Sequence, residues 1–321
     1  MYIANFKLFA ACLLSFSLLF FTSCEPEDTI TPMNIVETAQ ENSELTSLVE
    51  ALTDSRHTTD FATLLSGSTN YTTFAPNNAA FQALLDTDPS WTTLGDIPIA
   101  TLDAVLKYHV IAGAVKSTDL TASYVNTLST GPNSEAISLQ IEVSPSVKFN
   151  GDAAPVEVDV EATNGVIHII DKVMLPPTVV NHALNGANFT TLVAALTDSR
   201  HTTTDFVAVL GGTGPFTVFA PTNAAFQALL DSDPSWTTLG DIPIATLDVV
   251  LKYHVINGAN VQSDELTDGQ VVTTLEGSTL TVDLSAGAKL MTTSSQTVTI
   301  EATDVQGSNG VVHVINTVML P

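Results

Sequence analysis

Hydrophobic residues recur at helical spacing near the start of two stretches of the chain. Between residues 43 and 54, leucine and valine lie three or four positions apart, as on one face of an amphipathic helix. The positions are Leu45, Leu48, Val49 and Leu52, and the second stretch repeats them as Leu192, Val193 and Leu196. An amphipathic helix is therefore predicted to open each of two similar units.

The next predicted elements are a short strand and a capped helix. A β-prone segment, 71–75 or 216–220, leads through a proline to Asn77 or Thr222, after which apolar residues return to helical spacing. Asn and Thr share a side-chain oxygen that can accept from the first free amides of a helix. The occurrence of Asn in one copy and Thr in the other therefore predicts a helix N-cap at this position and argues against a catalytic hydroxyl.

Each unit then changes from a helical to a strand-like pattern. A further helix is predicted at 98–107 and at 243–252, where the leading proline costs no helical hydrogen bond. Downstream, Thr- and Val-rich segments are separated by Gly turns such as 276–278 and 285–287. A helix-rich half followed by a strand-rich half predicts an α+β fold for each unit.

The two units are copies at a nearly fixed offset. Phe74-Ala75-Pro76 recurs from Phe219, which gives 219 − 74 = 145 residues, and Lys107-Tyr108-His109 recurs from Lys252 at the same offset. This period far exceeds the roughly 20–50 residues of solenoid repeats, so each copy is expected to have its own core. We place the domains at 33–176 and 177–321, which meet at a stiff Pro176-Pro177 junction.

The copies are unequally similar along their length. Residues 74–111 and 219–256 differ only at 77/222, 87/232 and 104/249, whereas 112–163 and 257–308 have little in common. If the copies differ in binding specificity, the divergent part is where the difference is expected. Relaxed drift is the alternative explanation.

Composition narrows the class of protein. The 9 Lys and Arg against 34 Asp and Glu give a formal net charge of −25, which repels phosphate backbones, so nucleic acid is excluded as a partner. The 45% of hydrophobic residues suffices for packed cores. Both cysteines, Cys12 and Cys24, precede the domains, which excludes disulfides and thiolate chemistry from the folded part.

The first residues resemble an export signal. Lys7 precedes an apolar run from Leu8 to Phe21, which is too short to cross a bilayer and is typical of a signal peptide, here 1–23. The run ends in Phe21-Thr22-Ser23-Cys24, which resembles the lipobox of bacterial lipoproteins and predicts lipidation at Cys24. An ordinary secretory signal that happens to contain a cysteine is the alternative.

The segment after Cys24 is acidic. Residues 24–32 begin with Cys24-Glu25-Pro26-Glu27-Asp28, which resembles the signal that sends Bacteroidetes lipoproteins to the outer face of the outer membrane. A solvated tether is the alternative. The resemblance implies a lipid-anchored protein at the cell surface, held by the lipid alone because no later stretch is apolar enough to span a membrane.

Three segments, each present twice, resemble the marks of the fasciclin family. In the first copy they are Thr72-Thr73-Phe74-Ala75-Pro76-Asn77-Asn78-Ala79-Ala80-Phe81, Tyr108-His109-Val110-Ile111 and Asn164-Gly165-Val166-Ile167-His168-Ile169-Ile170-Asp171, and the second copy has counterparts from 216, 253 and 309. The resemblance covers roughly 33–321 and implies two tandem fasciclin-like domains, each a β-wedge with helices packed on it. It also implies an extracellular adhesion or matrix module without catalytic activity.

The histidines carry structural and functional alternatives. Strand alternation places His168 on the same face as Val166 and Ile170, where a neutral imidazole bonded to backbone is expected. For the pairs Tyr108-His109 and Tyr253-His254, the resemblance implies packing that braces a helix against the sheet. Direct contact with a partner and a metal or proton-transfer role are the alternatives.

Cofactor and metal motifs are weak. Asp86-x-Asp88 and Asp231-x-Asp233 could bind Ca²⁺ weakly, but they lack the Gly and the bidentate Glu of a twelve-residue calcium loop. Nucleophile-elbow, His-Glu-x-x-His and phosphate-loop motifs do not occur. We therefore expect no cofactor, no metal site and no enzyme activity.

The function expected from the sequence is adhesion at the cell surface, with a role in biofilm formation. The partners would be extracellular matrix, polysaccharide or the surface proteins of neighbouring cells. A structural spacer that holds another factor away from the membrane is one alternative. A hydrolase using carboxylates and histidines is another, and it requires His109, His168 and an ionised carboxylate to meet in an open cleft.

Overall fold

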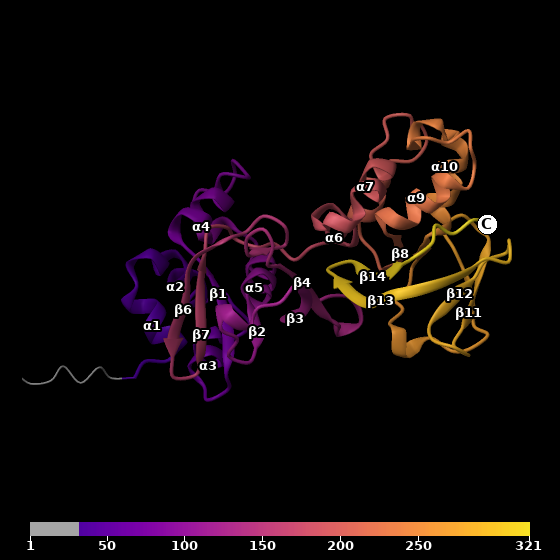
Figure 1. Cartoon of the computed structure of the whole chain (residues 1–321). Helices are drawn as coiled ribbons and strands as arrows, with labels where there is room; N and C mark the ends of the chain where they lie inside the picture. The colour runs from indigo at the N-terminus through magenta and orange to yellow at the C-terminus, as the bar shows by residue number, and fades with distance from the viewer. Residues whose placement is uncertain (1–31) are drawn as a thin grey trace, which may run out of the picture. The chain divides into compact units, whose positions relative to one another are not determined.

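The computed structural model describes residues 32–321, of which Met33–Pro321 form one compact unit. The predicted signal peptide at 1–23 and Cys24 lie outside the described residues, as does all but the last residue of the acidic segment. Residues 33–176 and 177–321 are called repeat 1 and repeat 2 below. Each has a helix-rich first part, interrupted by one central strand, and a strand-rich second part, so the predicted α+β class is confirmed (Figure 1).

The first part of repeat 1 contains five short helices, with one strand between the third and the fourth. They are α1 (Ile35–Glu41), α2 (Thr46–Leu52), α3 (Phe61–Ser66), α4 (Asn78–Leu85) and α5 (Ile99–Tyr108). The predicted N-cap before α4 is confirmed: Asn77 Oδ1 accepts from the Ala80 N–H at 2.9 Å, and Thr222 Oγ1 accepts from the Ala225 N–H at 3.3 Å in repeat 2. The helix predicted at 43–54 is divided, because Ser43–Leu45 forms a 3₁₀ turn before α2 begins.

The strands of repeat 1 form a seven-stranded sheet. They are β1 (Tyr71–Pro76), β2 (Val110–Ala112), β3 (Ser123–Thr130), β4 (Ala136–Glu142), β5 (Lys148–Phe149), β6 (Pro155–Ala162) and β7 (Gly165–Ile170). Their order is β5-β4-β3-β2-β1-β7-β6. The central pair β1 and β7 is parallel, with Phe74 opposite His168, and the other pairs are antiparallel.

Repeat 2 has the same helices, and its sheet is closed differently. Its helices are α6 (Val179–Asn185), α7 (Thr190–Leu196), α8 (Phe206–Gly211), α9 (Asn223–Asp231) and α10 (Ile244–Tyr253). Its strands are β8 (Phe216–Pro221), β9 (Val255–Asn257), β10 (Val271–Thr273), β11 (Thr279–Asp283), β12 (Lys289–Met291), β13 (Thr297–Gly307) and β14 (Gly310–Ile315). The order is β10-β11-β12-β13-β14-β8-β9, because the eleven-residue β13 pairs with both β12 and β14.

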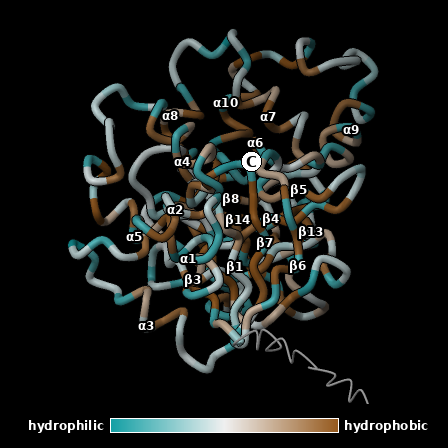
Figure 2. The backbone as a smooth tube through the Cα atoms, turned by 90° about the vertical axis from the view of Figure 1, so that its left-hand side faces the viewer, coloured by the Kyte–Doolittle hydropathy of each residue, from teal (hydrophilic) through white to brown (hydrophobic). Residues whose placement is uncertain are grey.

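Each repeat has two apolar cores on opposite sides of its central strands. In repeat 1, one core lies between the helices and β1 and β7, and the other lies among the strands around Phe74, Tyr108 and Phe149. Hydrophobic segments follow the central strands in Figure 2. Burial of each large apolar side chain contributes about 1.5–3 kcal/mol. This division is the β-wedge with packed helices that the resemblance implied.

The Asn-Gly dipeptide before β7 connects the helices to the sheet. Asn164 Oδ1 accepts from the Ile35 N–H at 2.9 Å, and Asn164 Nδ2 donates to the carbonyls of Leu65 and Gly67. Gly165 has φ +153°, and a Cβ there would lie 1.9 Å from the Tyr71 carbonyl oxygen. Glycine is therefore required at this close approach.

None of the helices within residues 32–321 has the length and hydrophobicity needed to cross a membrane.

Candidate functional site

The predicted Tyr-His pairs lie where α5 and α10 end. Tyr108 and Tyr253 are 0% exposed, and His109 and His254 are 2% and 3% exposed. Side chains so deeply buried are not accessible to a macromolecular partner in this conformation.

The tyrosine hydroxyls are held by backbone and amide groups. Tyr108 donates to the Ser138 carbonyl at 2.9 Å and accepts from Asn150 Nδ2 at 2.9 Å. Burial raises the pKa of Tyr108, so the phenol stays protonated. In repeat 2, Tyr253 donates to the Thr279 carbonyl at 2.8 Å. Both contacts join the last helix of a repeat to its divergent strands.

The two histidines hold one neutral tautomer. His109 Nδ1–H donates to the Val105 carbonyl at 2.7 Å, while Nε2 accepts from the Met174 N–H at 2.9 Å. His254 does the same with Val250 and Met319, at 2.7 and 2.9 Å. Burial lowers the pKa of both rings to about 4. Since both nitrogens are engaged, neither ring can bind a metal or transfer a proton without breaking these bonds.

The strand histidines are buried as expected. His168 is 0% exposed, its Nε2–H donates to the Val115 carbonyl at 3.0 Å, and its Nδ1 accepts from the Asp159 N–H at 3.3 Å. Burial lowers the pKa of His168. The nearest carboxylate oxygen, on Asp159, is 4.0 Å from Nδ1. The described residues therefore do not bring His109, His168 and a carboxylate into an open cleft.

The Asp-x-Asp pairs are occupied by local hydrogen bonds. Asp86 Oδ1 accepts from Gln82 Nε2 at 2.8 Å, and Asp88 Oδ1 accepts from the Ser90 N–H and hydroxyl at 2.9 and 2.7 Å. Asp231 and Asp233 repeat this arrangement. Within residues 32–321, no three His, Cys, Asp or Glu side chains are grouped so as to hold a metal ion.

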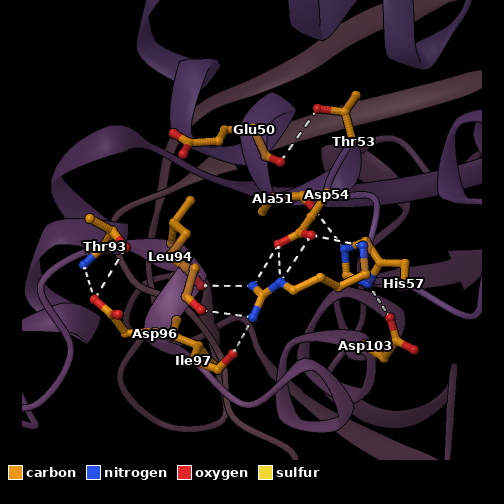
Figure 3. Close-up of polar contacts among 12 residues, drawn as sticks. Glu50, Ala51, Thr53, Asp54, His57, Thr93, Leu94, Asp96, Ile97 and Asp103 are labelled. Carbon is orange, nitrogen blue, oxygen red and sulfur yellow. Dashed lines mark hydrogen bonds and ion pairs between the residues drawn. The ribbon is translucent and has the colours of Figure 1, made fainter.

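A polar cluster that sequence reasoning did not single out lies at the loop after α2. Arg56 lies between the Asp54 carboxylate and the 3₁₀ turn that begins at Leu94, and both of these partners are labelled in Figure 3. Its guanidinium donates to Asp54 Oδ2 at 2.6 Å and to the carbonyls of Gly95, Ile97 and Leu94 at 2.7, 3.3 and 3.3 Å. Hydrogen bonds from Arg56 lower the pKa of Asp54 to about 2. Arg200 makes the same contacts in repeat 2.

The neighbouring His57 pairs with Asp103 of α5. His57 Nδ1 contacts Asp103 Oδ1, and Nε2 lies 2.6 Å from the Ala51 carbonyl oxygen. Both ring nitrogens are therefore engaged, one by a carboxylate oxygen and one by a backbone carbonyl oxygen. His201 and Asp248 form the same pair beside a hollow of about 580 Å³ lined by Thr202, Thr203 and Thr204 among others.

The signal for this cluster is present in the sequence. Leu-Thr-Asp-Ser-Arg-His stands unchanged at 52–57 and 196–201. Its partner Asp103 is 46 positions away from His57, so the pairing follows only from the fold. The contacts fasten the loop to α5.

Comparison with known proteins identifies the class. The Fasciclin domain profile matches the chain twice, over residues 43–176 and 187–321. The chain therefore belongs to the fasciclin family and carries two fasciclin domains in tandem.

Similar proteins differ widely in length. Over 268 residues the chain is 32% identical to transforming growth factor-beta-induced protein ig-h3 of pig (Sus scrofa), which covers 80% of this chain and 35% of that protein. Human periostin is 28% identical over 262 residues, 80% of this chain and 29% of periostin. An uncharacterized Synechocystis protein is 36% identical over 144 residues, 45% of this chain and 98% of that protein. The chain thus spans only about a third of ig-h3 and of periostin.

Among solved structures, a FAS1 domain pair from the insect cell adhesion molecule Fasciclin I matches with a TM-score of 0.47 and 19% identity, covering 78% of this chain and 89% of that one.

Proposed function

We propose that the protein is a non-catalytic, lipid-anchored adhesion protein of the cell surface that recognises matrix, glycan or neighbouring-cell components. The observation that carries the proposal is the tandem pair of fasciclin domains, because family membership supports an adhesion-type role. The engagement of both ring nitrogens of His109, His168 and His57 supports recognition over turnover.

The anchor is proposed at Cys24. It rests on the apolar run that ends at Phe21 and on the acidic residues that follow, which suit export of a lipoprotein to the outer face of an outer membrane. Residues 1–23 would be removed, 24–32 would form the tether, and the domains 33–176 and 177–321 would extend from it.

The buried Tyr-His pairs are proposed to brace the domains. Tyr108 and His109 contact three separate segments through Ser138, Asn150 and Met174, and they are shielded from solvent. Their contribution to adhesion would then be indirect, by holding the divergent strands in place.

An array of matrix proteins, neutral glycans and acidic glycans, probed with the full chain, tests the recognition role. Saturable binding to at least one class, with the bound polymer recovered at unchanged length, is the expected result. Absence of binding across the array would favour the spacer alternative, and a shortened polymer would favour a hydrolase.

Labelling of the producing cells with a fatty-acid analogue tests the anchor separately. Incorporation in the wild-type chain, but not in Cys24→Ser, is expected. Equal labelling of both chains, or none, contradicts lipidation at Cys24.

A further inference from the structure

Repeat 1 presents a polar strand face to repeat 2. Along β4, alternation sends Ile137, Leu139 and Ile141 into the core of repeat 1. The intervening residues Ser138, Gln140 and Glu142 therefore lie on the opposite face. Ser138 Oγ accepts from the Gln306 N–H of repeat 2 at 3.0 Å.

Tyr124 of β3 extends the same face. It lies directly opposite Gln140 in the β3–β4 register, and its ring packs edge-on against His182 of α6 at 5.9 Å between ring centroids. The ring also packs against the apolar core of repeat 2. These contacts fix the position of Tyr124 between the two repeats.

A groove of about 400 Å³ opens beside these contacts. One side is formed by Ser123, Tyr124, Gln140 and Glu142, and the other by the segment 186–189, which joins α6 to α7. We call it the junction groove. Its volume lies within the range of small-molecule sites, and its walls combine an aromatic ring with polar side chains.

The junction groove has unused hydrogen-bonding capacity. Gln140 is 9% exposed, its Nε2 donates to Glu142 Oε1 at 3.2 Å, and its Oε1 is buried without a partner. Because the terminal amide torsion is broad, rotation can turn that oxygen toward the groove. A buried acceptor without a partner is costly and gains from a donor supplied by a ligand.

The charges of the groove select against anions. Its lining contains Glu142 and no Lys, Arg or His, and the whole chain has a formal net charge of −25. Burial raises the pKa of Tyr124 to about 12, with Glu142 as a lesser cause, so its hydroxyl remains a donor at neutral pH. A fitting ligand therefore offers several hydroxyl donors, some acceptors, no negative charge and an apolar face for the ring.

The aromatic and polar groove residues contributed by repeat 1 have no equivalents in repeat 2. At the offset of 145, the positions of Tyr124, Gln140 and Glu142 correspond to Gly269, Ser285 and Gly287 in repeat 2. The stretch 112–163 in which the copies diverge thus supplies the aromatic ring, the amide and the carboxylate.

We propose that the junction groove binds a neutral saccharide, with C–H groups of the sugar on the Tyr124 ring and sugar hydroxyls on Tyr124, Gln140 and Glu142. The groove size suits about one or two sugar rings. This inference rests on the proposed recognition role and gives it a ligand class and a place.

Titration of the full chain with cellobiose, maltose and mannobiose, followed by amide chemical shifts, tests the proposal. At least one neutral disaccharide at about 10 mM should shift the amides of Tyr124, Gln140 and Asn188 in a saturable way. Digalacturonic acid, the acidic counterpart, should shift them far less. Failure of every neutral disaccharide, shifts centred elsewhere, or equal binding of the acidic sugar would overturn the proposal.

Conservative variants separate direct contact from folding. Tyr124→Phe should weaken binding about fivefold and Glu142→Gln about tenfold, because each loses one hydrogen bond to the ligand. The matched controls Tyr71→Phe and Glu157→Gln lie outside the groove and should bind like the wild type. Equal weakening in the controls, or unchanged binding in both groove variants, contradicts the assignment.

A parallel adhesion assay keeps the two proposals distinguishable. If the wild type binds no disaccharide in the groove yet adheres to a surface, adhesion uses another surface and the groove proposal fails alone. If the wild type binds disaccharide in the groove and adheres to nothing, the adhesion role fails and the saccharide site stands.

Discussion

His109 Nε2 accepts a hydrogen bond from the Met174 N–H at 2.9 Å, which ties the end of α5 to the last segment of repeat 1. His254 and Met319 repeat the contact at the same distance. Because the ring must be neutral at Nε2 to accept, the contact makes each repeat sensitive to acid.

Stability should fall between pH 6.5 and 4. Burial lowers the pKa of His109, His182 and His254 from 6.5 to about 4. As pH falls through 6.5 the unfolded chain binds protons on these rings, and the folded chain does not until about pH 4. The stabilisation is thus full above pH 6.5 and lost by pH 4, about 3 kcal/mol for each ring. Urea unfolding at pH 7.0 and 4.5 measures it.

Proton uptake on unfolding gives the matching control. At pH 5.5, calorimetry in buffers of different ionisation enthalpy should detect uptake of about two to three protons. Hydrogen bonds lower the pKa of the surface carboxylates Asp54 and Asp96 to about 2, so these groups contribute to the proton uptake mainly below pH 4. Unfolding without uptake at pH 5.5 would show that these histidines are not held neutral.

The hydroxyl of Tyr108 should stabilise the fold, because it makes two buried hydrogen bonds. Tyr108→Phe removes the phenol that Asn150 Nδ2 donates to and that donates to the Ser138 carbonyl, so we expect a loss of about 1–3 kcal/mol in the free energy of unfolding. The control Tyr71→Phe, at a half-buried residue at the start of β1, should change the free energy of unfolding by less than about 0.5 kcal/mol. Similar losses in both variants, measured by urea unfolding, would contradict the bracing role.

Glycine at position 165 should be indispensable. Gly165→Ala places a Cβ 1.9 Å from the Tyr71 carbonyl at φ +153°, so a loss above about 3 kcal/mol is expected. Gly113→Ala, at φ +89° with nothing within 4 Å, should cost about 1 kcal/mol for the backbone conformation alone. Thermal unfolding compares the two variants, and equal shifts in melting temperature would show that the close approach does not constrain the chain.

Lysine should not replace Arg56 without a loss of stability, because several N–H groups of the planar guanidinium donate to different partners. Arg56→Lys keeps the charge but cannot reach Asp54 and the carbonyls of the Leu94 turn together, so urea unfolding should show a lower free energy of unfolding than in the wild type. Three of the six side-chain hydrogen bonds of Arg56 go to backbone carbonyls, so 0.5 M salt should reduce the difference without abolishing it. A difference that vanishes in salt would assign the effect to charge alone.

Local features were the most predictable from the sequence. The N-caps at Asn77 and Thr222, the helices after Pro98 and Pro243, and the turn at Gly277 follow from a few neighbouring residues, and the structure has each of them. The burial of His168 was also predictable, because strand alternation places it on the same face as the apolar residues Val166 and Ile170. The tandem fasciclin architecture came from motif order and the 145-residue offset.

Features that join distant segments could not be predicted. The His57–Asp103 pair and the contact of Tyr124 with His182 depend on how loops and strands meet in space. The different closure of the two sheets depends on β13 extending to β12, while β3 pairs with β2 in repeat 1. The sequences of the two repeats diverge in this part, and no short motif in either of them indicates which strands pair.

Retention of beads under flow most directly tests the claim that the paired domains hold the cell to its surroundings. Beads carrying the full chain would pass over surfaces coated with matrix protein or with neutral or acidic polysaccharide. The account predicts retention on at least one coating, blocked by soluble chain and absent from beads carrying albumin. Retention no better than that of albumin on every coating would contradict it.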